Sequence, residues 1–304
     1  MKLFIEKILL FLLFLAIGGY FIFTLADGNS DPFYTRFTSP RQSSLVLGTS
    51  KAAQGVQPAV LNEVLGRNDI YNYAFTVAHS PYGPVYLRSI KNKLDPGTKD
   101  GVFIVTVDPY SIASRAENPE DSSNYRENNL ALASVEDVNQ DPNIKYLLYE
   151  YPYKYIYLIT KKLNYVSNEK LHANGWYEVN ISMKDKDHRD RVERKLQSYS
   201  KKLKDYKKSK LRLRYLEKTI RFLKQHGKVY LVRLPVSAPF LELEDQLDPN
   251  FDTKMRNLSK KFDIPYLVIK DSLYDFTDGN HLYKKSGYKV SQKIAEWIKD
   301  IQNR

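Results

Sequence analysis

The sequence predicts an α/β fold built on a mostly parallel sheet. Short apolar segments typical of buried strands alternate with amphipathic segments typical of helices, and this alternation favours a parallel sheet covered by helices. The segment Gly101–Val107 is an unbroken, β-branched run, as expected of a strand with both faces covered. The end of the chain carries an apolar stripe at helical spacing, which predicts a final amphipathic helix. One transmembrane helix and one helical insertion are predicted beside this fold.

The predicted elements follow one another in a regular order. Ser44–Leu47 is a short apolar run that reads as the first strand. Pro58–Leu65 is a helix, because proline suits its first turn and Gly66 its end. The other predicted strands are Asp69–Phe75, Lys228–Leu234 and Pro265–Ile269; Gly83–Leu94 is a further helix, and the last helix carries Val290, Ile294, Trp297, Ile298 and Ile301.

Residues 1–26 are predicted to be a membrane anchor. The run Ile8–Leu25 contains no charged residue and approaches the roughly 20 residues that span a bilayer. Cleavable signal sequences have shorter apolar cores, so we expect an uncleaved anchor, with cleavage after Ala26 as the alternative. Lys2 and Lys7 precede the run, and the positive-inside rule then places the following domain outside the cytoplasm, in the periplasm or at the cell surface.

The rest of the chain divides into a linker and one domain. Residues 27–42 are polar and contain Gly, Ser and Pro, which predicts a linker, and residues 43–304 form the α/β domain. An insertion at about 112–227 interrupts the alternation of strands and helices. Its last part, 185–226, is dense in Lys and Arg and has apolar residues at helical spacing, which predicts two helices or one bent helix. We expect the insertion to shape a substrate site or to pack against the core.

Charge and cysteine content limit the classes of function. The net charge of +12 favours anionic partners such as lipid head groups, acidic polysaccharide or nucleic acid. The excess charge lies in 185–226, where a solvated helical face is the simpler interpretation, and a domain outside the cytoplasm is not expected to meet nucleic acid. The absence of cysteine excludes disulfides, thiolate metal sites and cysteine nucleophiles. No metal-ligand spacing occurs, so neither a metal nor another cofactor is expected.

Polar residues that lie far apart in the sequence are predicted to meet at one edge of the sheet. Ligands of parallel sheets bind beyond the carboxyl ends of the strands. Ser50, Ala78–Ser80, Asp108–Ser111 and His281 each follow a predicted strand. The sequence therefore predicts a single site to which all four segments contribute.

Ser50, His281 and Asp278 are the predicted catalytic triad of this site. A serine hydroxyl becomes nucleophilic when a base takes its proton, and His281 suits that role if a carboxylate holds its other ring nitrogen. Asp278, three residues before the histidine, is the expected carboxylate, and Asp275 is the alternative. Ala52 stands where a Gly-x-Ser-x-Gly motif has its second glycine, which argues against the nucleophile elbow of α/β-hydrolases.

The developing oxyanion of such a reaction needs hydrogen-bond donors. The backbone N–H of Ser50 and one N–H from the turn formed by Ala78, His79 and Ser80 are the expected donors. His79 itself either binds substrate or packs inside the protein. Trp176 stacks on a sugar ring in one interpretation and is a core or interface residue in the other.

Four blocks of the sequence resemble, in order, the signature blocks of SGNH (GDSL-like) hydrolases. They are LVLGTSKAAQGVQPAVLNEVL, YNYAFTVAHSPYGPVYL, VFIVTVDPYSI and DFTDGNHLYKKSGYKVSQ, and the resemblance covers about 44–111 and 228–300. The matching residues are Gly48, Ser50, Gly55, Pro58, Asn72, Asp278, His281 and Leu282.

The resemblance implies a flavodoxin-like three-layer α/β/α sandwich in which Ser50, Asp278 and His281 catalyse ester hydrolysis or acyl transfer. With its predicted membrane anchor, the chain is similar to one branch of this family, the polysaccharide O-acetylation and D-alanyl transfer proteins. That branch implies action on acyl groups of a cell-envelope glycan, and acetyl is the expected acyl group. It also implies a membrane-bound O-acyltransferase as a partner protein.

The chain departs from the family pattern at the expected oxyanion site. The family has Gly-x-Asn-Asp in its third block, and its Asn donates to the oxyanion; Asp108 stands near that position here. Tyr110 or Ser111 would then be the donor, or the oxyanion would rely on backbone donors alone. In the second block, Ala78 and His79 replace the usual glycines. The alternative function is therefore an inactive SGNH-like module that binds glycan or serves as a scaffold for a membrane O-acyltransferase.

Overall fold

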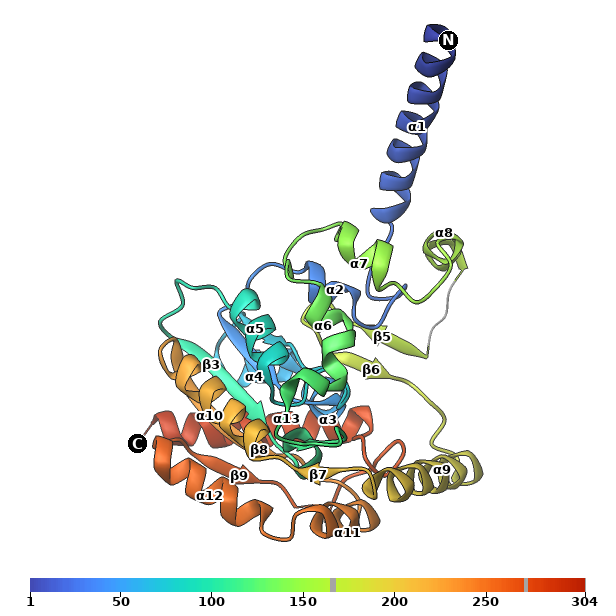
Figure 1. Ribbon diagram of the computed structural model, residues 1–304. Helices are drawn as coiled ribbons and strands as arrows, with labels where there is room; N and C mark the ends of the chain where they lie inside the picture. The colour runs from blue at the N-terminus through green and yellow to red at the C-terminus, as the bar shows by residue number, and fades with distance from the viewer. Residues whose placement is uncertain (165–167, 271–272, 304) are drawn as a thin grey trace.

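The computed structural model describes residues 1–164, 168–270 and 273–303, and its centre is a five-stranded parallel sheet (Figure 1). The strands are β1 (Ser44–Leu47), β2 (Ile70–Asn72), β3 (Gly101–Thr106), β8 (Gly227–Arg233) and β9 (Tyr266–Val268). They lie in the order β2-β1-β3-β8-β9, and every neighbouring pair is parallel. This is the flavodoxin-like strand order, and it confirms the predicted fold class.

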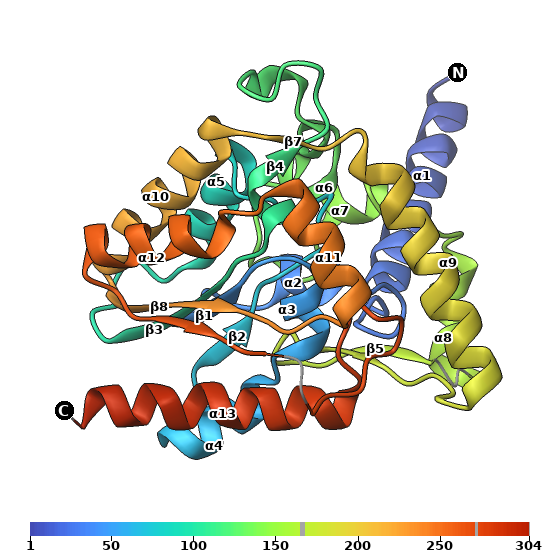
Figure 2. The ribbon, with the colours of Figure 1, turned by 90° about the horizontal axis from the view of Figure 1, so that it is seen from below.

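Helices cover both faces of the sheet (Figure 2). Successive strand residues point to opposite faces, so Leu45 and Leu47 belong to one core cluster and Val46 to the other. Because both faces are buried, the strands are apolar throughout, as the sequence of β3 predicts. One helical layer contains α3 (Ser50–Gly55), α4 (Pro58–Leu65) and α13 (Lys284–Gln302), and the other contains α5 (Pro84–Lys93), α10 (Lys210–Lys224) and α12 (Phe251–Phe262).

β2 is shorter than the strand predicted at 69–75. Its last residue, Asn72, donates its side-chain amide to the carbonyls of Ala52 and Val56, both at 2.8 Å. The side-chain oxygen of Asn72 accepts from the N–H of Ala74 at 3.1 Å. These bonds turn the chain out of the sheet and hold it against α3, which begins at Ser50.

A long helix, α1 (Lys2–Phe23), stands apart from the domain and buries none of its residues (Figure 1). Its length and apolar composition are sufficient to cross a membrane. The segment 27–42, predicted as a linker, is largely packed against the domain and contains α2 (Tyr34–Thr38). Tyr34 and Phe37 of this segment belong to the apolar core beside the sheet, and the carboxylate of Asp31 is buried against the Tyr146 hydroxyl.

The insertion between β3 and β8 folds into several short elements and one long helix, α9 (Asp185–Leu203). Its α7 (Ile144–Tyr149) and α8 (Ile156–Asn164) lie near the end of α1 (Figure 1). The last helix of the insertion, α10, belongs to the core layer, so the peripheral part ends before residue 210. The remaining elements of the chain are η1 (Pro109–Ile112), β4 (Ala113–Ser114), η2 (Ser122–Asn124), η3 (Arg126–Asn129), α6 (Ala131–Ser134), β5 (Glu169–Leu171), β6 (Tyr177–Val179), β7 (Lys207–Lys208) and, after β8, α11 (Ala238–Leu247).

Candidate active site

Ser50 lies just beyond the carboxyl end of β1, in the first turn of α3. The turn depends on Gly48, whose φ is +144° and where a Cβ atom would lie 1.8 Å from the Thr106 hydroxyl oxygen. Any other residue would be strained here and would clash with β3. Gly48 also donates its N–H to the Tyr86 hydroxyl at 3.1 Å. Glycine thus lets the chain turn sharply and leaves the serine partly exposed at the edge of the sheet.

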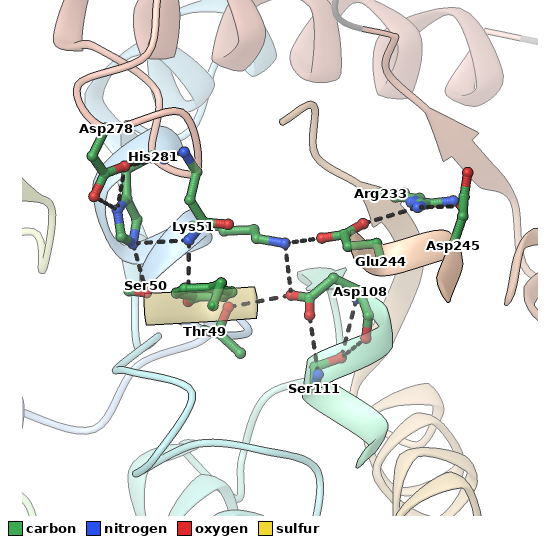
Figure 3. Close-up of polar contacts among 12 residues, drawn as sticks. Thr49, Ser50, Lys51, Asp108, Ser111, Arg233, Glu244, Asp245, Asp278 and His281 are labelled. Carbon is green, nitrogen blue, oxygen red and sulfur yellow. Dashed lines mark hydrogen bonds and ion pairs between the residues drawn. The ribbon is translucent and has the colours of Figure 1, made fainter. Parts of the chain in front are cut away.

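The predicted triad residues form one continuous chain of contacts (Figure 3). Nε2 of His281 lies 2.8 Å from Oγ of Ser50. Nδ1 of the same ring lies 2.8 Å and 3.0 Å from the two carboxylate oxygens of Asp278. A proton on Nδ1 is therefore donated to the carboxylate, which leaves Nε2 free to accept the hydroxyl proton of the serine.

The loop that carries Asp278 and His281 is fixed by its own backbone. The N–H of His281 donates to Asp278 at 2.9 Å, and the N–H of Thr277 donates to the His281 carbonyl at 2.8 Å. Gly279 has a φ of +82° and lies against Phe240, where a side chain would clash. Asp275, the alternative carboxylate, is exposed, and it is Asp278 that contacts the imidazole.

Asp278 is held in its ionised form. Burial acts to raise the pKa of this carboxyl, but contact with His281 and attraction by Lys195 outweigh it and hold the pKa well below its usual range. The ammonium of Lys195, from α9, lies 3.3 Å from the carboxylate. An ionised carboxylate at Nδ1 stabilises the imidazolium that forms when the serine loses its proton.

The turn after β2 has its amide groups directed inward. The N–H of Ala78 donates to the Thr76 hydroxyl at 3.2 Å, and the N–H groups of His79 and Ser80 donate to the Thr76 carbonyl. The Ser80 hydroxyl donates to the carbonyl of Gly48 at 2.7 Å, so it holds the turn against the end of β1. Thus none of these three amides is left free to face an oxyanion.

His79 is packed inside this turn. Its ring lies 4.8 Å from the ring of Phe33, and its Nδ1 lies 2.8 Å from the Thr76 hydroxyl. Burial lowers the pKa of His79 to about 4, so the ring is neutral at physiological pH. This arrangement corresponds to the packing role among the two roles expected for His79.

Asp108 reaches the site edge but has partners of its own. Its carboxylate accepts from the Thr49 hydroxyl at 3.3 Å and from the N–H of Ser111 at 3.0 Å, and Lys51 lies 3.7 Å away. The Ser111 hydroxyl donates to the Asp108 carbonyl at 2.6 Å. Within the described residues, the buried hydroxyl of Tyr110 has no hydrogen-bond partner. Of the two side-chain donors expected here, Tyr110 is the one that remains free.

A buried chain of charges starts at the residue after the nucleophile (Figure 3). Lys51 contacts Glu244 of α11, and Glu244 contacts Arg233 at the end of β8 at 2.8 Å. The side chains of Lys51 and Glu244 are 7% and 2% exposed, so both charges depend on each other for solvation. The chain joins α3, β8 and α11 directly behind Ser50.

Comparison with known proteins found a likeness to a solved structure. No family model matches the chain, and no curated protein matches it. Among solved structures, the chain is similar to an inhibitor-bound aryl esterase of M. smegmatis. The two are 12% identical with a TM-score of 0.35, over 84% of this chain and 99% of the esterase.

Sequence reasoning missed the residues that the insertion brings to the site. Lys195 contacts Asp278, and the Tyr199 hydroxyl accepts from the side-chain amide of Asn280 at 3.3 Å. Both come from α9, whose basic composition predicts a solvated face. Their spacing of four residues places them on one side of the helix, but no pattern in the sequence identifies what that side covers.

Among the described residues, no group of three or more His, Asp and Glu side chains is arranged to hold a metal ion.

Proposed function

We propose that this protein is a serine esterase or O-acyltransferase that acts outside the cytoplasm on acyl groups of a cell-envelope glycan. The observation that carries the proposal is the continuous contact chain from Ser50 through His281 to Asp278. The topology expected from α1 supports the location, and the sequence resemblance to SGNH hydrolases supports the reaction class. The acetyl group, the glycan and a membrane-bound O-acyltransferase partner follow from that resemblance alone.

The proposed reaction has two half-reactions. His281 takes the proton of Ser50 while Oγ attacks the acyl carbonyl, and general-base help of this kind contributes roughly 10²–10⁴-fold. The tetrahedral intermediate expels the original alcohol, which receives the proton from His281, and leaves an acyl-serine. Water or a sugar hydroxyl then gives its proton to His281 and attacks the same carbonyl, which releases the acid or the new ester and restores Ser50.

The oxyanion requires donors in this scheme. The N–H of Ser50, in the first turn of α3, has no acceptor within the helix and is one donor. The free hydroxyl of Tyr110 is the candidate for a second. Asp108 does not stand as an isolated negative charge, because Lys51 and two hydrogen-bond donors compensate it.

A second candidate function is an inactive module that binds glycan or supports an acyltransferase. The inward direction of the Ala78, His79 and Ser80 amides favours it, because these amides supply no donor to an oxyanion. Loss of one such donor costs roughly 3–4 kcal/mol of transition-state stabilisation.

Covalent labelling with a fluorophosphonate separates the two functions. The wild-type protein, Ser50→Ala and His281→Ala are treated alike, and mass spectrometry locates the labelled peptide. We expect labelling on Ser50 that is lost in both variants, because the serine is nucleophilic only with its base. Labelling elsewhere, or labelling of Ser50 that persists in His281→Ala, contradicts the triad. A folded wild-type protein that resists the probe favours the binding module.

A further inference from the structure

A cleft of about 590 Å³ is lined by residues of the insertion and of the turn after β2. Its volume falls within the range of small-molecule sites. Tyr199 lines the cleft and also accepts a hydrogen bond from Asn280, whose side-chain nitrogen lies 3.5 Å from Nε2 of His281. Ala78, from the turn after β2, lines the cleft as well. Only Tyr199 and Asn280 therefore separate a ligand in this part of the cleft from the proposed catalytic base.

Positive charge exceeds negative charge along this cleft, whose lining contains six Lys and Arg side chains and three carboxylates, those of Glu117, Glu127 and Asp205. Arg126 and Lys202 form no ion pair with any residue that the structure describes. Partial burial and repulsion by neighbouring cations lower the pKa of the Lys202 amine. The cations of the cleft that do have carboxylate partners are Arg115, with Asp205 at 2.7 Å, and Arg212, with Glu127 at 2.8 Å.

We propose that the cleft binds an anionic group, a carboxylate or a phosphate, of the glycan whose acyl ester reaches Ser50. The inference rests on the proposed function and adds the substrate class, an anionic glycan. An anion between Arg126 and Lys202 relieves the repulsion among the cations and accepts charge-assisted hydrogen bonds. Binding of this anionic group, away from the reacting carbonyl, selects an anionic glycan over a neutral one.

The test uses the full chain as the Ser50→Ala variant, so that no turnover occurs. Calorimetry measures binding of a galacturonic acid trimer, inorganic tripolyphosphate and the neutral trimer maltotriose. The double variant Arg126→Gln with Lys202→Gln is compared with Lys260→Gln with Lys299→Gln, an equal loss of charge at exposed residues of α12 and α13. We expect the cleft variant to lose anion affinity by about tenfold or more and the control to retain it.

The two anions distinguish a carboxylate-bearing from a phosphate-bearing glycan. Equal affinity in the cleft variant and the control, or tight binding of maltotriose, overturns the inference. Anion binding in the cleft by a protein whose Ser50 does not react with the fluorophosphonate would keep the cleft as an anion-binding site and remove the proposed catalytic function.

A second inference rests on exposed apolar side chains near α1. Apart from Met1 and the residues of α1, nine large apolar residues are exposed in the described structure, and six of them lie within residues 148–157. A cluster of exposed apolar side chains of this kind marks a surface that contacts a partner or a membrane. The six, which we call the juxtamembrane surface, are Leu148, Tyr149, Tyr153, Tyr155, Ile156 and Tyr157.

The juxtamembrane surface is fixed to the end of α1 that meets the domain (Figure 1). The ring of Tyr155 lies 5.3 Å from the ring of Phe23, the last residue of α1. The Tyr146 hydroxyl of α7 donates to the buried carboxylate of Asp31 at 3.0 Å. The ammonium of Lys161 in α8 donates to the carbonyl of Ser30 at 3.3 Å. These contacts hold the end of α1 and the residues that follow it against the juxtamembrane surface and its flanking residues.

We infer that the juxtamembrane surface lies in the head-group region of the bilayer that α1 enters. Tyrosine is enriched at that depth because its ring is apolar and its hydroxyl is polar. Lys145 and Lys154 are exposed on the same segment, where an anionic head group attracts them. The bilayer would then set the orientation of the domain, and with it the direction in which the triad faces.

Spin labels at single cysteines test this inference, because the natural chain has no cysteine. Tyr149→Cys, Tyr157→Cys and the control Tyr288→Cys are labelled in the full chain in phosphatidylcholine–phosphatidylglycerol nanodiscs. Tyr288 of α13 is 48% exposed, close to the 44% of Tyr157. We expect labels at 149 and 157 to collide more with oxygen and less with a water-soluble nickel chelate than the label at 288. Equal collision ratios at all three positions would overturn it.

Discussion

At the scale of single residues, Ser50 and His281 are separated by most of the domain sequence and lie 2.8 Å apart. The position of each depends on a glycine with a positive φ, which other residues rarely adopt. These glycines are Gly48 at the end of β1 and Gly279 in the loop that carries the histidine. Asp278 is ionised and shared between His281 and Lys195. The three side chains proposed as the triad are thus in contact before any substrate binds.

Asp278→Asn tests the role of the carboxylate. The amide removes the negative charge that holds the Nδ1 proton, so hydrolysis of 4-nitrophenyl acetate is expected to slow on the order of 10⁴-fold. Asp275→Asn, which makes the same chemical change at an exposed position three residues earlier, is expected to leave the rate nearly unchanged. Equal rates in the two variants would show that Asp278 does not orient the base.

His79 makes stability depend on pH. Its pKa is about 4 in the folded protein against an ordinary value of 6.5, so between these values only the unfolded chain binds the proton. The free energy of unfolding is therefore expected to fall as pH drops from 6.5 to 4, by up to about 3 kcal/mol from this group. Urea denaturation across that range should show a shallower fall for His79→Gln. Parallel curves for the two proteins would exclude this role.

At the scale of elements, the insertion and α11 complete a site that the sheet begins. α9 holds the triad loop from one side: Lys195 contacts Asp278, and Arg191 donates to the Thr277 carbonyl at 3.1 Å. α11 holds α3 from the other side, through Glu244 and Lys51. The site edge of the sheet is therefore rigid on both flanks of the serine.

Glu244→Gln tests the buried charge chain. The change leaves Lys51 and Arg233 with less compensation inside the protein, and disruption of a buried pair costs about 3 kcal/mol or more. The free energy of unfolding in urea is expected to fall by that amount. Glu242→Gln, at an exposed position of the same helix, should change it by less than about 0.5 kcal/mol. A similar small effect for both variants would mean that the chain of charges adds little stability.

At the scale of the whole molecule, α1 and the domain are one continuous structure. The segment expected to be a linker is buried in part, with Asp31 and Phe37 among its buried residues. A helix long enough to cross a membrane therefore continues into a domain whose orientation it restricts.

Lys99→Cys tests on which side of the membrane the domain lies. Residue 99 is exposed, and the cysteine would be the only one in the chain. Because Lys2 and Lys7 are expected to keep the amino end in the cytoplasm, a membrane-impermeant maleimide should label this cysteine in intact cells. The same reagent after lysis gives the maximum signal. Labelling that appears only after lysis would place the domain in the cytoplasm.

The fold class could be predicted from the sequence because it depends on local patterns. The apolar run of β3, the proline that begins α4 and the stripe of α13 each reflect burial of one segment, and each lies where predicted. Ser50 and His281 could be chosen because residues after parallel strands converge on one edge. Asp278 could be chosen because it is close in sequence to the histidine it contacts.

The contacts across the sequence required the tertiary structure. Nothing local in the basic helix α9 identifies Asp278 as the partner of Lys195, and nothing local in Lys51 identifies Glu244. The polar segment 27–42 is packed because aromatic side chains distant in sequence cover it. Sequence patterns record whether a side chain is buried. Which charged group lies next to a buried charge depends on how segments distant in sequence pack together, and only the folded molecule contains that information.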